Sequence, residues 1–161
     1  MQPRTVMQPR TVMQPRTGGP VINAPAANAV LTPGQPFDFD YATMADYGRS
    51  SYNFTVWLFA SDLRDVSLAS ASQAITTGHY FGRFAEENYP GNPYPKNPVP
   101  STLTMPDFSV APGGFGSGKS ASDQTMYLVV FEEWADWDGS LGDKIAFAST
   151  PIIYNGTSTS T

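Results

Sequence analysis

The stretch SSYNFTVWLFAS, residues 50–61, alternates two sets of side chains. One set is Tyr52, Phe54, Val56 and Leu58, and the other is Asn53, Thr55, Trp57 and Phe59. Successive side chains of a β-strand point to opposite faces of the sheet, so this period of two indicates a strand. If Asn53 carries a glycan, its face must be exposed to solvent at that end of the strand.

Further segments on both sides show strand patterns, whereas helix signals are scarce in a chain with 15 Pro and 14 Gly. Residues 21–41 predict an extended strand, a turn at Pro33-Gly34, and a strand on which Phe37, Phe39 and Tyr41 face away from Asp38 and Asp40. We expect two strands in residues 65–85, a central strand in 125–134, and a last strand in 144–157, broken near Pro151 at an edge or a bulge. About seven strands predict an all-β, immunoglobulin-like antiparallel β-sandwich.

One long Pro/Gly-rich loop, residues 87–122, interrupts this pattern and contains no credible regular element. Its aromatic residues and spaced prolines indicate an ordered loop packed across a sheet face. A length of 161 residues fits one domain. We therefore expect the sandwich in residues 20–157, preceded by a repeat arm in 1–19 and followed by a polar tail in 158–161.

The arm, defined as residues 1–19, repeats the unit MQPRTV and carries Arg4, Arg10 and Arg16 without an acidic residue. The rest of the chain has six basic and 14 acidic residues, a formal charge of −8. So acidic a body repels phosphate backbones, and nucleic acid is not an expected partner. Three interpretations of the arm stay open. It is an artefact of gene prediction, a flexible tail, or an extended strand that joins an acidic neighbour into a homo-oligomer or filament.

The compartment must be inferred from indirect marks. The chain has no run of ~20 apolar residues, so no membrane insertion is expected, and its start lacks the apolar core of a signal peptide. Asn53-Phe54-Thr55 and Asn155-Gly156-Thr157 match the N-glycosylation pattern, and the chain contains no Cys. These marks predict an exported chain with a removed or replaced signal and with Asn53 and Asn155 as glycosylation sites.

Catalytic residues are few. His79 is the only histidine, and without Cys neither a Ser-His-Asp nor a Cys-His apparatus is well supplied. A copper-dependent polysaccharide oxygenase would need two histidines, one of them N-terminal, and this chain has only His79. Glu86-Glu87 and Glu132-Glu133 are acidic pairs whose members point to opposite faces, although one Glu from each pair could still meet another. We therefore expect no enzymatic activity, no cofactor, and ordinary surface charge at these positions.

Two candidate binding sites stand out. Asp136, Asp138 and Asp143 lie near one turn and are weak candidates for Ca²⁺ ligands, although a solvated hairpin explains them better. Exposed aromatic residues could stack against sugar rings, and the expected carbohydrate contacts are Trp134, Trp137, Tyr89 and Tyr94. Trp57 and Tyr80 are further aromatic candidates, but we expect Trp57 in the core, where a sandwich usually holds a tryptophan.

Two resemblances accompany these patterns. PAANAVLTPGQPFDFDY, residues 25–41, followed by a Trp-bearing strand, resembles the opening of the immunoglobulin-like module in Ser/Thr-rich, often GPI-anchored fungal cell-wall proteins. ADYGRSSYNFTVWLF, GHYFGRFAEENYPGNPYPKNP, LTMPDFS and IIYN resemble small, cysteine-free secreted proteins of mushroom-forming fungi over residues 21–157. The second resemblance implies a secreted fungal protein and transfers no catalytic residue.

Together these observations predict a non-enzymatic structural or interaction protein, secreted to the fungal cell surface or extracellular matrix. The most specific version of this prediction is a protein that self-assembles through its N-terminal arm. The alternative is a module that binds cell-wall polysaccharide through exposed aromatic residues. A hydrolase ranks last.

Overall fold

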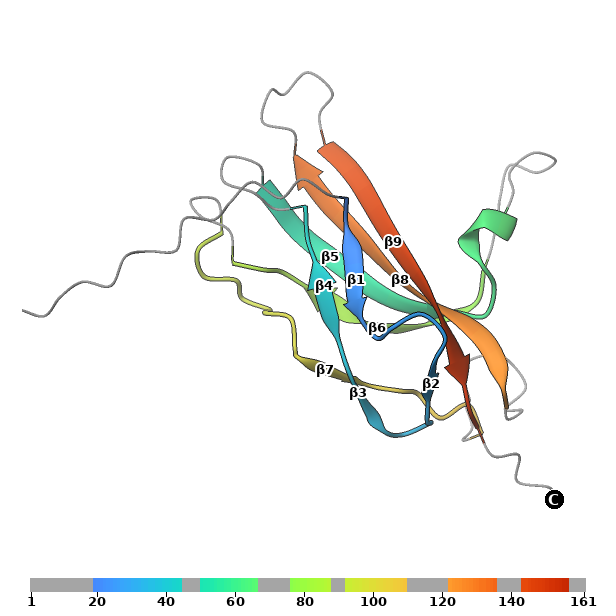
Figure 1. The fold of residues 1–161 in the computed structure, drawn as a ribbon. Helices are drawn as coiled ribbons and strands as arrows, with labels where there is room; N and C mark the ends of the chain where they lie inside the picture. The colour runs from blue at the N-terminus through green and yellow to red at the C-terminus, as the bar shows by residue number, and fades with distance from the viewer. Residues whose placement is uncertain are drawn as a thin grey trace, which may run out of the picture.

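The computed structural model describes residues 19–44, 50–66, 76–87, 92–109, 122–135 and 143–156 (Figure 1). These residues form nine strands and one short 3-10 turn, η1 (Leu63–Asp65), which confirms the all-β prediction. No helix in the described part of the chain is long and apolar enough to cross a membrane. Arg4, Arg10 and Arg16 of the repeat arm lie outside the described residues.

The larger layer is a five-stranded sheet. Its strands, in spatial order, are β2 (Ala29–Leu31), β9 (Asp143–Tyr154), β8 (Gln124–Ala135), β5 (Ser50–Phe59) and β6 (Gly78–Phe84). β2 runs parallel to β9, and the other neighbours are antiparallel. β8 pairs along its length with both β5 and β9, so the apolar run of residues 125–134 forms a central strand as predicted.

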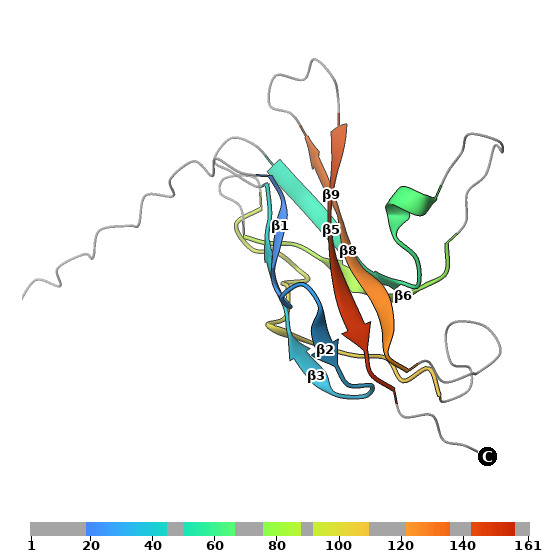
Figure 2. The same cartoon turned by 45° about the vertical axis from the view of Figure 1, so that its right-hand side comes forward.

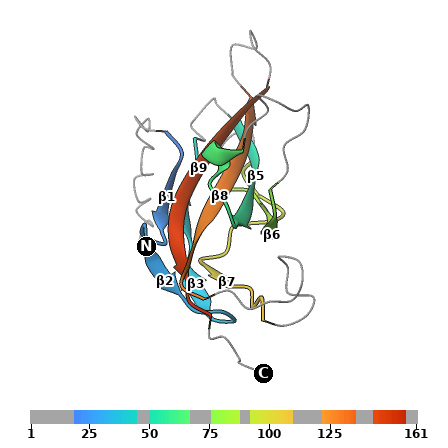
Figure 3. The same ribbon diagram turned by 90° about the vertical axis from the view of Figure 1, so that its right-hand side faces the viewer.

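The second layer consists of two small antiparallel sheets. β1 (Val21–Ala24) pairs with β4 (Asp40–Ala42), and β3 (Pro36–Asp38) pairs with β7 (Thr102–Thr104). Figure 2 shows β1 and β3 on one side of the five-stranded sheet and η1 on the other, and Figure 3, viewed from that other side, places η1 in front of the sheet. The fold is thus a two-layer β-sandwich. The immunoglobulin-like topology stays a prediction.

The strand count exceeds the expected seven because residues 21–42 are divided among four short strands. Of these, β2 belongs to the larger layer and the other three to the smaller one. The predicted turn at Pro33-Gly34 is confirmed: Gly34 has a φ of 72°, and the Gln35 N–H donates to the Thr32 carbonyl at 3.2 Å. A proline followed by a residue of positive φ is typical of a type II turn, which favours glycine at that place. This turn carries the chain from β2 to β3.

The core fills the space between the layers. Phe54, Val56 and Leu58 of β5 are fully buried, as their alternation predicts. From the opposite layer, Phe37, Phe39 and Tyr41 point inward, while Asp38 and Asp40 are exposed. The other buried apolar residues of this cluster are Leu103, Met105, Phe108, Met126, Leu128, Val130, Ile152 and Tyr154.

The long Pro/Gly-rich loop contributes to this core. The prediction that it lacks regular structure is wrong at residues 102–104, because β7 pairs there with β3. Leu103, Met105 and Phe108 are buried, which agrees with a loop packed across a sheet face. The Phe108 N–H donates to the Tyr154 hydroxyl at 3.0 Å, and that hydroxyl donates to the Pro106 carbonyl at 3.1 Å.

The last strand is not broken at Pro151. β9 continues to Tyr154, and Pro151 lies opposite Tyr127 of β8. The Asn28 N–H donates to the Pro151 carbonyl at 2.8 Å, so the carbonyl and ring nitrogen of Pro151 face the β2 side of the strand. The missing N–H therefore removes no hydrogen bond to β8. Because β9 lies between β2 and β8 and its pairing with β8 has no register shift, the predicted edge or bulge and the predicted interruption are both wrong at Pro151.

Residues 65–85 differ in part from the two expected strands. β6 forms one of them. The preceding part contains η1, where the Asp62 carboxylate accepts a hydrogen bond from the Arg64 N–H at 2.9 Å. Residues 67–75 lie outside the described part of the chain.

Candidate functional site

The outer face of the five-stranded sheet, the face that points away from the core, brings aromatic residues of four strands together. Cross-strand register places Trp57 of β5 opposite Tyr80 of β6, and places Phe131 of β8 opposite Phe147 of β9. Phe59 lies two residues beyond Trp57 on the same face. We call Trp57, Phe59, Tyr80, Phe131 and Phe147 the outer aromatic cluster.

Ring contacts connect most of this cluster. Trp57 stacks on Phe59 with centroids 5.6 Å apart and an interplanar angle of 9°. Tyr80 lies 4.8 Å from Trp57, and Phe131 lies 6.4 Å from Phe59 in an edge-to-face arrangement. Such aromatic contacts add to the stabilisation from burial and restrict the rings. The centre of the cluster is therefore held in place before any partner binds.

The margins of the cluster are exposed. Tyr80 is 47% exposed and Phe147 67%, and Ile145, two residues before Phe147, is 69% exposed. Phe59, by contrast, is 6% exposed. A single exposed apolar side chain is ordinary, but several on one sheet face form a patch of the kind that marks an interaction surface.

Polar side chains lie on the same face. Arg83 of β6 and Glu133 of β8 form an ion pair at 2.6 Å, and each side chain is 49% exposed. Because β5 runs between these two strands, the ion pair crosses over β5. Asn53 is opposite Glu133, and Thr55 is opposite Arg83 and Phe131. We call Asn53, Thr55, Arg83 and Glu133 the polar margin. The outer face thus offers hydrogen-bonding groups beside aromatic rings.

The expectation that Trp57 lies in the core is wrong. Trp57 is partly exposed on the outer face, on the opposite side of β5 from Phe54, Val56 and Leu58. The sequence held a signal for this placement, because Trp57 shares the parity of Asn53, whose glycosylation pattern indicates solvent. A tryptophan usually lies in the core of a sandwich, but here the alternation of β5 places Trp57 on the outer face.

The carbohydrate contacts expected from the sequence are only partly described. Tyr94 is 88% exposed in the segment 92–109. The backbone of Trp134 lies in β8, but its side chain is outside the description, as are Tyr89 and Trp137 entirely. The expected glycosylation site Asn155 is exposed directly after β9.

The expected Ca²⁺ ligands lie mostly outside the described residues. Asp136 and Asp138 are not described, and Asp143 is described only by its backbone at the start of β9. Among the side chains that the structure describes, no three His, Cys, Asp or Glu residues are grouped so as to hold a metal ion. The calcium hypothesis stays a prediction.

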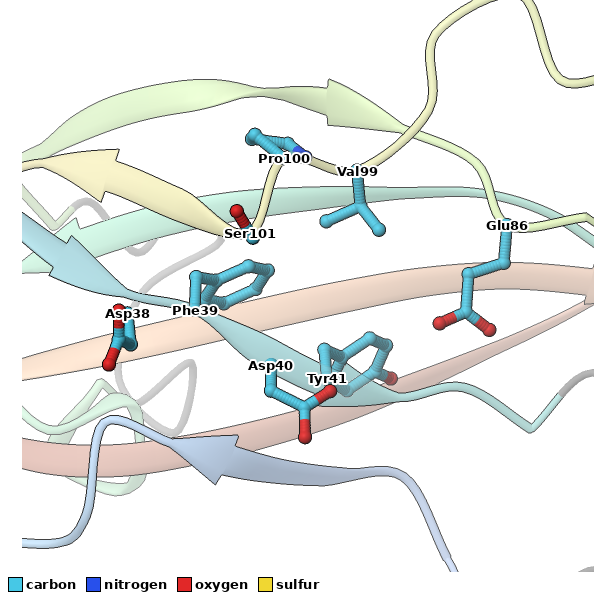
Figure 4. Close-up of a pocket in the computed structure, with 8 residues that line it drawn as sticks. All are labelled: Asp38, Phe39, Asp40, Tyr41, Glu86, Val99, Pro100 and Ser101. Carbon is cyan, nitrogen blue, oxygen red and sulfur yellow. The ribbon is translucent and has the colours of Figure 1, made fainter.

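A hollow of about 480 Å³ lies along the smaller layer (Figure 4). Its lining residues come from the segment of β3 and β4, the residues after β6 and the segment before β7: Asp38, Phe39, Asp40, Tyr41, Glu86, Val99, Pro100 and Ser101. In Figure 4 the Glu86 carboxylate reaches toward the ring of Tyr41. Among the described residues, three carboxylates and no cationic side chain therefore line this hollow.

One member of each acidic pair forms hydrogen bonds near this hollow. Glu132 is fully buried, and its carboxylate accepts hydrogen bonds from the Tyr41 hydroxyl at 2.6 Å and from the Met44 N–H at 2.9 Å. Glu86 accepts from the Thr43 hydroxyl at 2.7 Å. One Glu of each pair thus bonds to consecutive residues at the end of β4. The expectation of ordinary surface charge is wrong for Glu132.

This arrangement affects the ionisation of Tyr41. Burial raises the pKa of the Tyr41 hydroxyl well above its usual value, and the hydrogen bond to Glu132 and the charges of Glu132 and Glu86 raise it further. A neutral hydroxyl donates to a carboxylate, whereas a phenolate would repel it. Asp40 is likewise bonded to a neutral donor, the Asn23 side-chain amide at 3.1 Å. These contacts give Glu132, Glu86 and Asp40 a role in holding β4.

His79 lies in β6, on the core side of the sheet. Its ring contacts Phe81 edge to face at 4.8 Å, and burial lowers its pKa. Its cross-strand partner is Leu58. Among the described residues, these contacts of His79 are with apolar side chains.

Comparisons with known proteins identify no family for the chain. No protein-family model and no curated protein sequence matches it. Among solved structures it is similar to a cellulose-active polysaccharide monooxygenase from M. thermophila, with 12% identity and a TM-score of 0.41. The match covers 84% of this chain and 57% of that protein's length.

This match corrects one prediction. The sequence predicted a protein without enzymatic activity, whereas the matching structure is that of an enzyme, so that prediction is contradicted and is not retained. A likeness at this TM-score supplies no activity or site for the present chain, and the function must be argued from the described residues.

Proposed function

We propose that the protein is extracellular and binds cell-wall polysaccharide with the outer face of its five-stranded sheet. The observation that carries this proposal is the outer aromatic cluster, with Tyr80 and Phe147 exposed at its two margins and Trp57 packed between Phe59 and Tyr80. Aromatic rings contact the C–H groups of sugars, and neighbouring polar groups bind their hydroxyls.

The dimensions suit a chain-like ligand. Tyr80, Trp57, Phe131 and Phe147 come from β6, β5, β8 and β9, four adjacent strands. Neighbouring strands lie about 4.8 Å apart, so the cluster spans about 14 Å across the sheet, enough for several linked sugar rings. Phe131 and Phe147 share the cross-strand row of Thr55, two residues from the row of Trp57 and Tyr80, so a ligand lying obliquely across the strands would contact the rings in succession.

The polar margin supports a sugar rather than a purely apolar partner. Arg83, Glu133 and Thr55 lie beside the rings on the same face. An obligate protein interface is typically more apolar and depleted of charge at its centre. Hydroxyl-rich polymers, in contrast, use both the apolar rings and the exposed hydrogen-bonding groups.

The extracellular location rests on separate support. Two N-glycosylation patterns and the resemblance to secreted proteins of mushroom-forming fungi favour export, and fungal wall polysaccharides are then the polymers at hand. Self-assembly through the repeat arm stays a prediction.

The test is retention of the full chain by insoluble cellulose, β-glucan and chitin. We expect one of these polymers to retain the protein, and Tyr80→Ala and Phe147→Ala to weaken retention about tenfold each, as truncation of an exposed aromatic anchor does. Val21→Ala, which shortens an exposed apolar side chain of β1 in the smaller layer, is the control and should bind normally. Absence of retention by every polymer, or equal loss with Val21→Ala, would overturn the proposal.

A further inference from the structure

The two N-glycosylation patterns occupy very different places. Asn53 lies on the outer face of β5, and Thr55, which completes its pattern, lies on the same face. Asn155 follows the far end of β9, where its N–H donates to the Leu31 carbonyl at 3.1 Å. Since Asn53 shares a cross-strand row with Glu133 and Ile145, about ten residues of β9 separate the two patterns, roughly 33 Å of extended strand.

Asn53 adjoins the outer aromatic cluster. The next row along the sheet contains Thr55, Phe131 and Phe147. Trp57 lies four residues further along β5, or about 13 Å in an extended strand. A group attached to Asn53 is therefore within reach of the exposed rings.

The ion pair of the polar margin restricts the direction in which a group attached to Asn53 can extend. Arg83 and Glu133 meet across β5 at 2.6 Å, and they flank Asn53 and Thr55 by register. The Arg83 guanidinium can donate to sugar hydroxyls, and the Glu133 carboxylate can accept from them. The first sugar on Asn53 would thus be held on the outer face.

We infer that Asn53 is a site of N-linked glycosylation, and that its glycan covers the outer aromatic cluster and controls the access of polysaccharide to it. In the attachment step, the Asn53 side-chain nitrogen loses a proton and bonds to the anomeric carbon of an oligosaccharide. The bond between that carbon and its lipid-diphosphate carrier breaks, and the carrier leaves. No oxidation is involved. The control of polysaccharide access rests on the proposed function, whereas coverage of the rings does not.

The physical basis is competition for one surface. An N-glycan is bulky and strongly solvated. Tethered at the margin of the cluster, it has a high effective concentration for Tyr80 and Phe147, so a free polymer must displace it. A glycan on Asn155 lacks this proximity, which makes the two sites unequal in effect.

The experiment begins with the full chain secreted by a glycosylating yeast. Mass spectrometry of peptides measures occupancy at Asn53 and Asn155, and hydroxyl-radical footprinting measures the reactivity of Tyr80 and Phe147. We expect Asn53 to be occupied, and both Asn53→Gln and Thr55→Val to raise the reactivity of these rings several-fold. The two variants remove the same pattern through different residues, so a folding defect in one would not be shared by the other.

Asn155→Gln is the matched control and should leave the footprint unchanged. An unoccupied Asn53, or equal reactivity with and without its glycan, would overturn the inference regardless of any polymer binding.

Retention by polysaccharide then tests the control of access. We expect the Asn53→Gln protein from yeast to be retained several-fold more strongly than the glycosylated chain, and to match the unglycosylated chain made in bacterial cytoplasm. Equal retention of all three would refute the control of access but leave the proposed function intact. No retention of the unglycosylated chain would refute the proposed function and the control of access, while the footprint would still decide whether the glycan covers the rings.

Discussion

The two faces of the five-stranded sheet are built from alternate residues of the same strands, and both are rich in aromatic side chains. On the core face, Phe54 is fully buried against Tyr41 and Phe84, with ring centroids 5.0 and 6.0 Å away. On the outer face, Phe147 is mostly exposed. Composition alone does not separate a core from a binding surface. The cover supplied by β1, β3, β4 and β7 on one side does.

The faces also differ in how they treat charge. The core face contains a single buried carboxylate, Glu132, among its described residues, and this carboxylate is satisfied by neutral donors. The outer face carries its neighbour Glu133 in an ion pair open to water. Two adjacent glutamates thus perform different tasks, because one points into the sandwich and the other away from it.

The largest expected difference between the faces is in the cost of removing a ring. Phe54→Ala should lower the free energy of unfolding by about 3–5 kcal/mol, since it leaves a cavity in the core. Phe147→Ala should change it by less than about 0.5 kcal/mol, because the ring is largely solvated already. Urea unfolding measures both. A comparable loss from the two variants would mean that Phe147 is covered in solution.

The same substitution at adjacent positions gives the next test. Glu132→Leu should cost about 2–4 kcal/mol, because it leaves the Tyr41 hydroxyl and the Met44 N–H buried without their acceptor. Glu133→Leu should cost less than about 1 kcal/mol, as expected for an exposed ion pair.

Adding Tyr41→Phe to Glu132→Leu should restore part of the loss, because it removes one of the two donors left without an acceptor. If the double variant is less stable than Glu132→Leu alone, this explanation of the cost is wrong.

The fold was more predictable than the site, for a physical reason. Alternation in β5 and around Phe37, Phe39 and Tyr41 is local information, and it correctly grouped the side chains that share a face, although Phe59 on the outer face is buried as well. The hydrogen bonds of Glu86 to Thr43 and of Glu132 to Met44 join residues far apart in the chain, which one sequence does not specify. The division of residues 21–42 between two layers has the same origin.

The outer aromatic cluster was partly predictable from the sequence. The parity of Trp57 and Phe59 was visible in the sequence, but their neighbours Tyr80, Phe131 and Phe147 came from three other strands whose register the sequence does not fix. A one-residue change of register would have moved those rings to the core face. The alternation in β5 therefore indicated only that Trp57 and Phe59 share a face, and it did not indicate the rings that the other strands contribute.

Alkaline pH should lower the free energy of unfolding through Tyr41 on the core face, an effect of intermediate size. The pKa of Tyr41 is raised in the folded protein, so the unfolded chain loses this proton first as the pH rises above about 10. The stabilisation from the neutral hydroxyl is fully present below that pH, and above it the free energy of unfolding should fall by about 1.4 kcal/mol for each pH unit. Tyr41→Phe should remove this contribution.

Urea unfolding at several pH values between 9 and about 11.5, a window chosen to bracket the usual tyrosine pKa, measures this slope. Tyr154, whose pKa burial also raises, contributes in both proteins and serves as the internal reference. Equal slopes for the wild-type and Tyr41→Phe proteins would contradict the burial of a neutral Tyr41 hydroxyl.

The smallest expected effect is that of the ion pair on the outer face. A double-mutant cycle with Arg83→Met and Glu133→Gln should give a coupling energy of about 0.2–1 kcal/mol, because both side chains are half exposed. Added salt should reduce it further. A larger, salt-independent coupling would show that water is excluded from the pair, and that the outer face is covered.

Among the described residues, the polar contacts between the layers include two at opposite ends of the paired strands β8 and β9. Near one end, Glu132 of β8 bonds to Tyr41, and at the other, Tyr154 of β9 bonds to Phe108 and Pro106. Apolar contacts have little directionality and allow one layer to slide or turn on the other. A single directional contact would leave a pivot, whereas two separated ones fix both the offset and the angle between the layers.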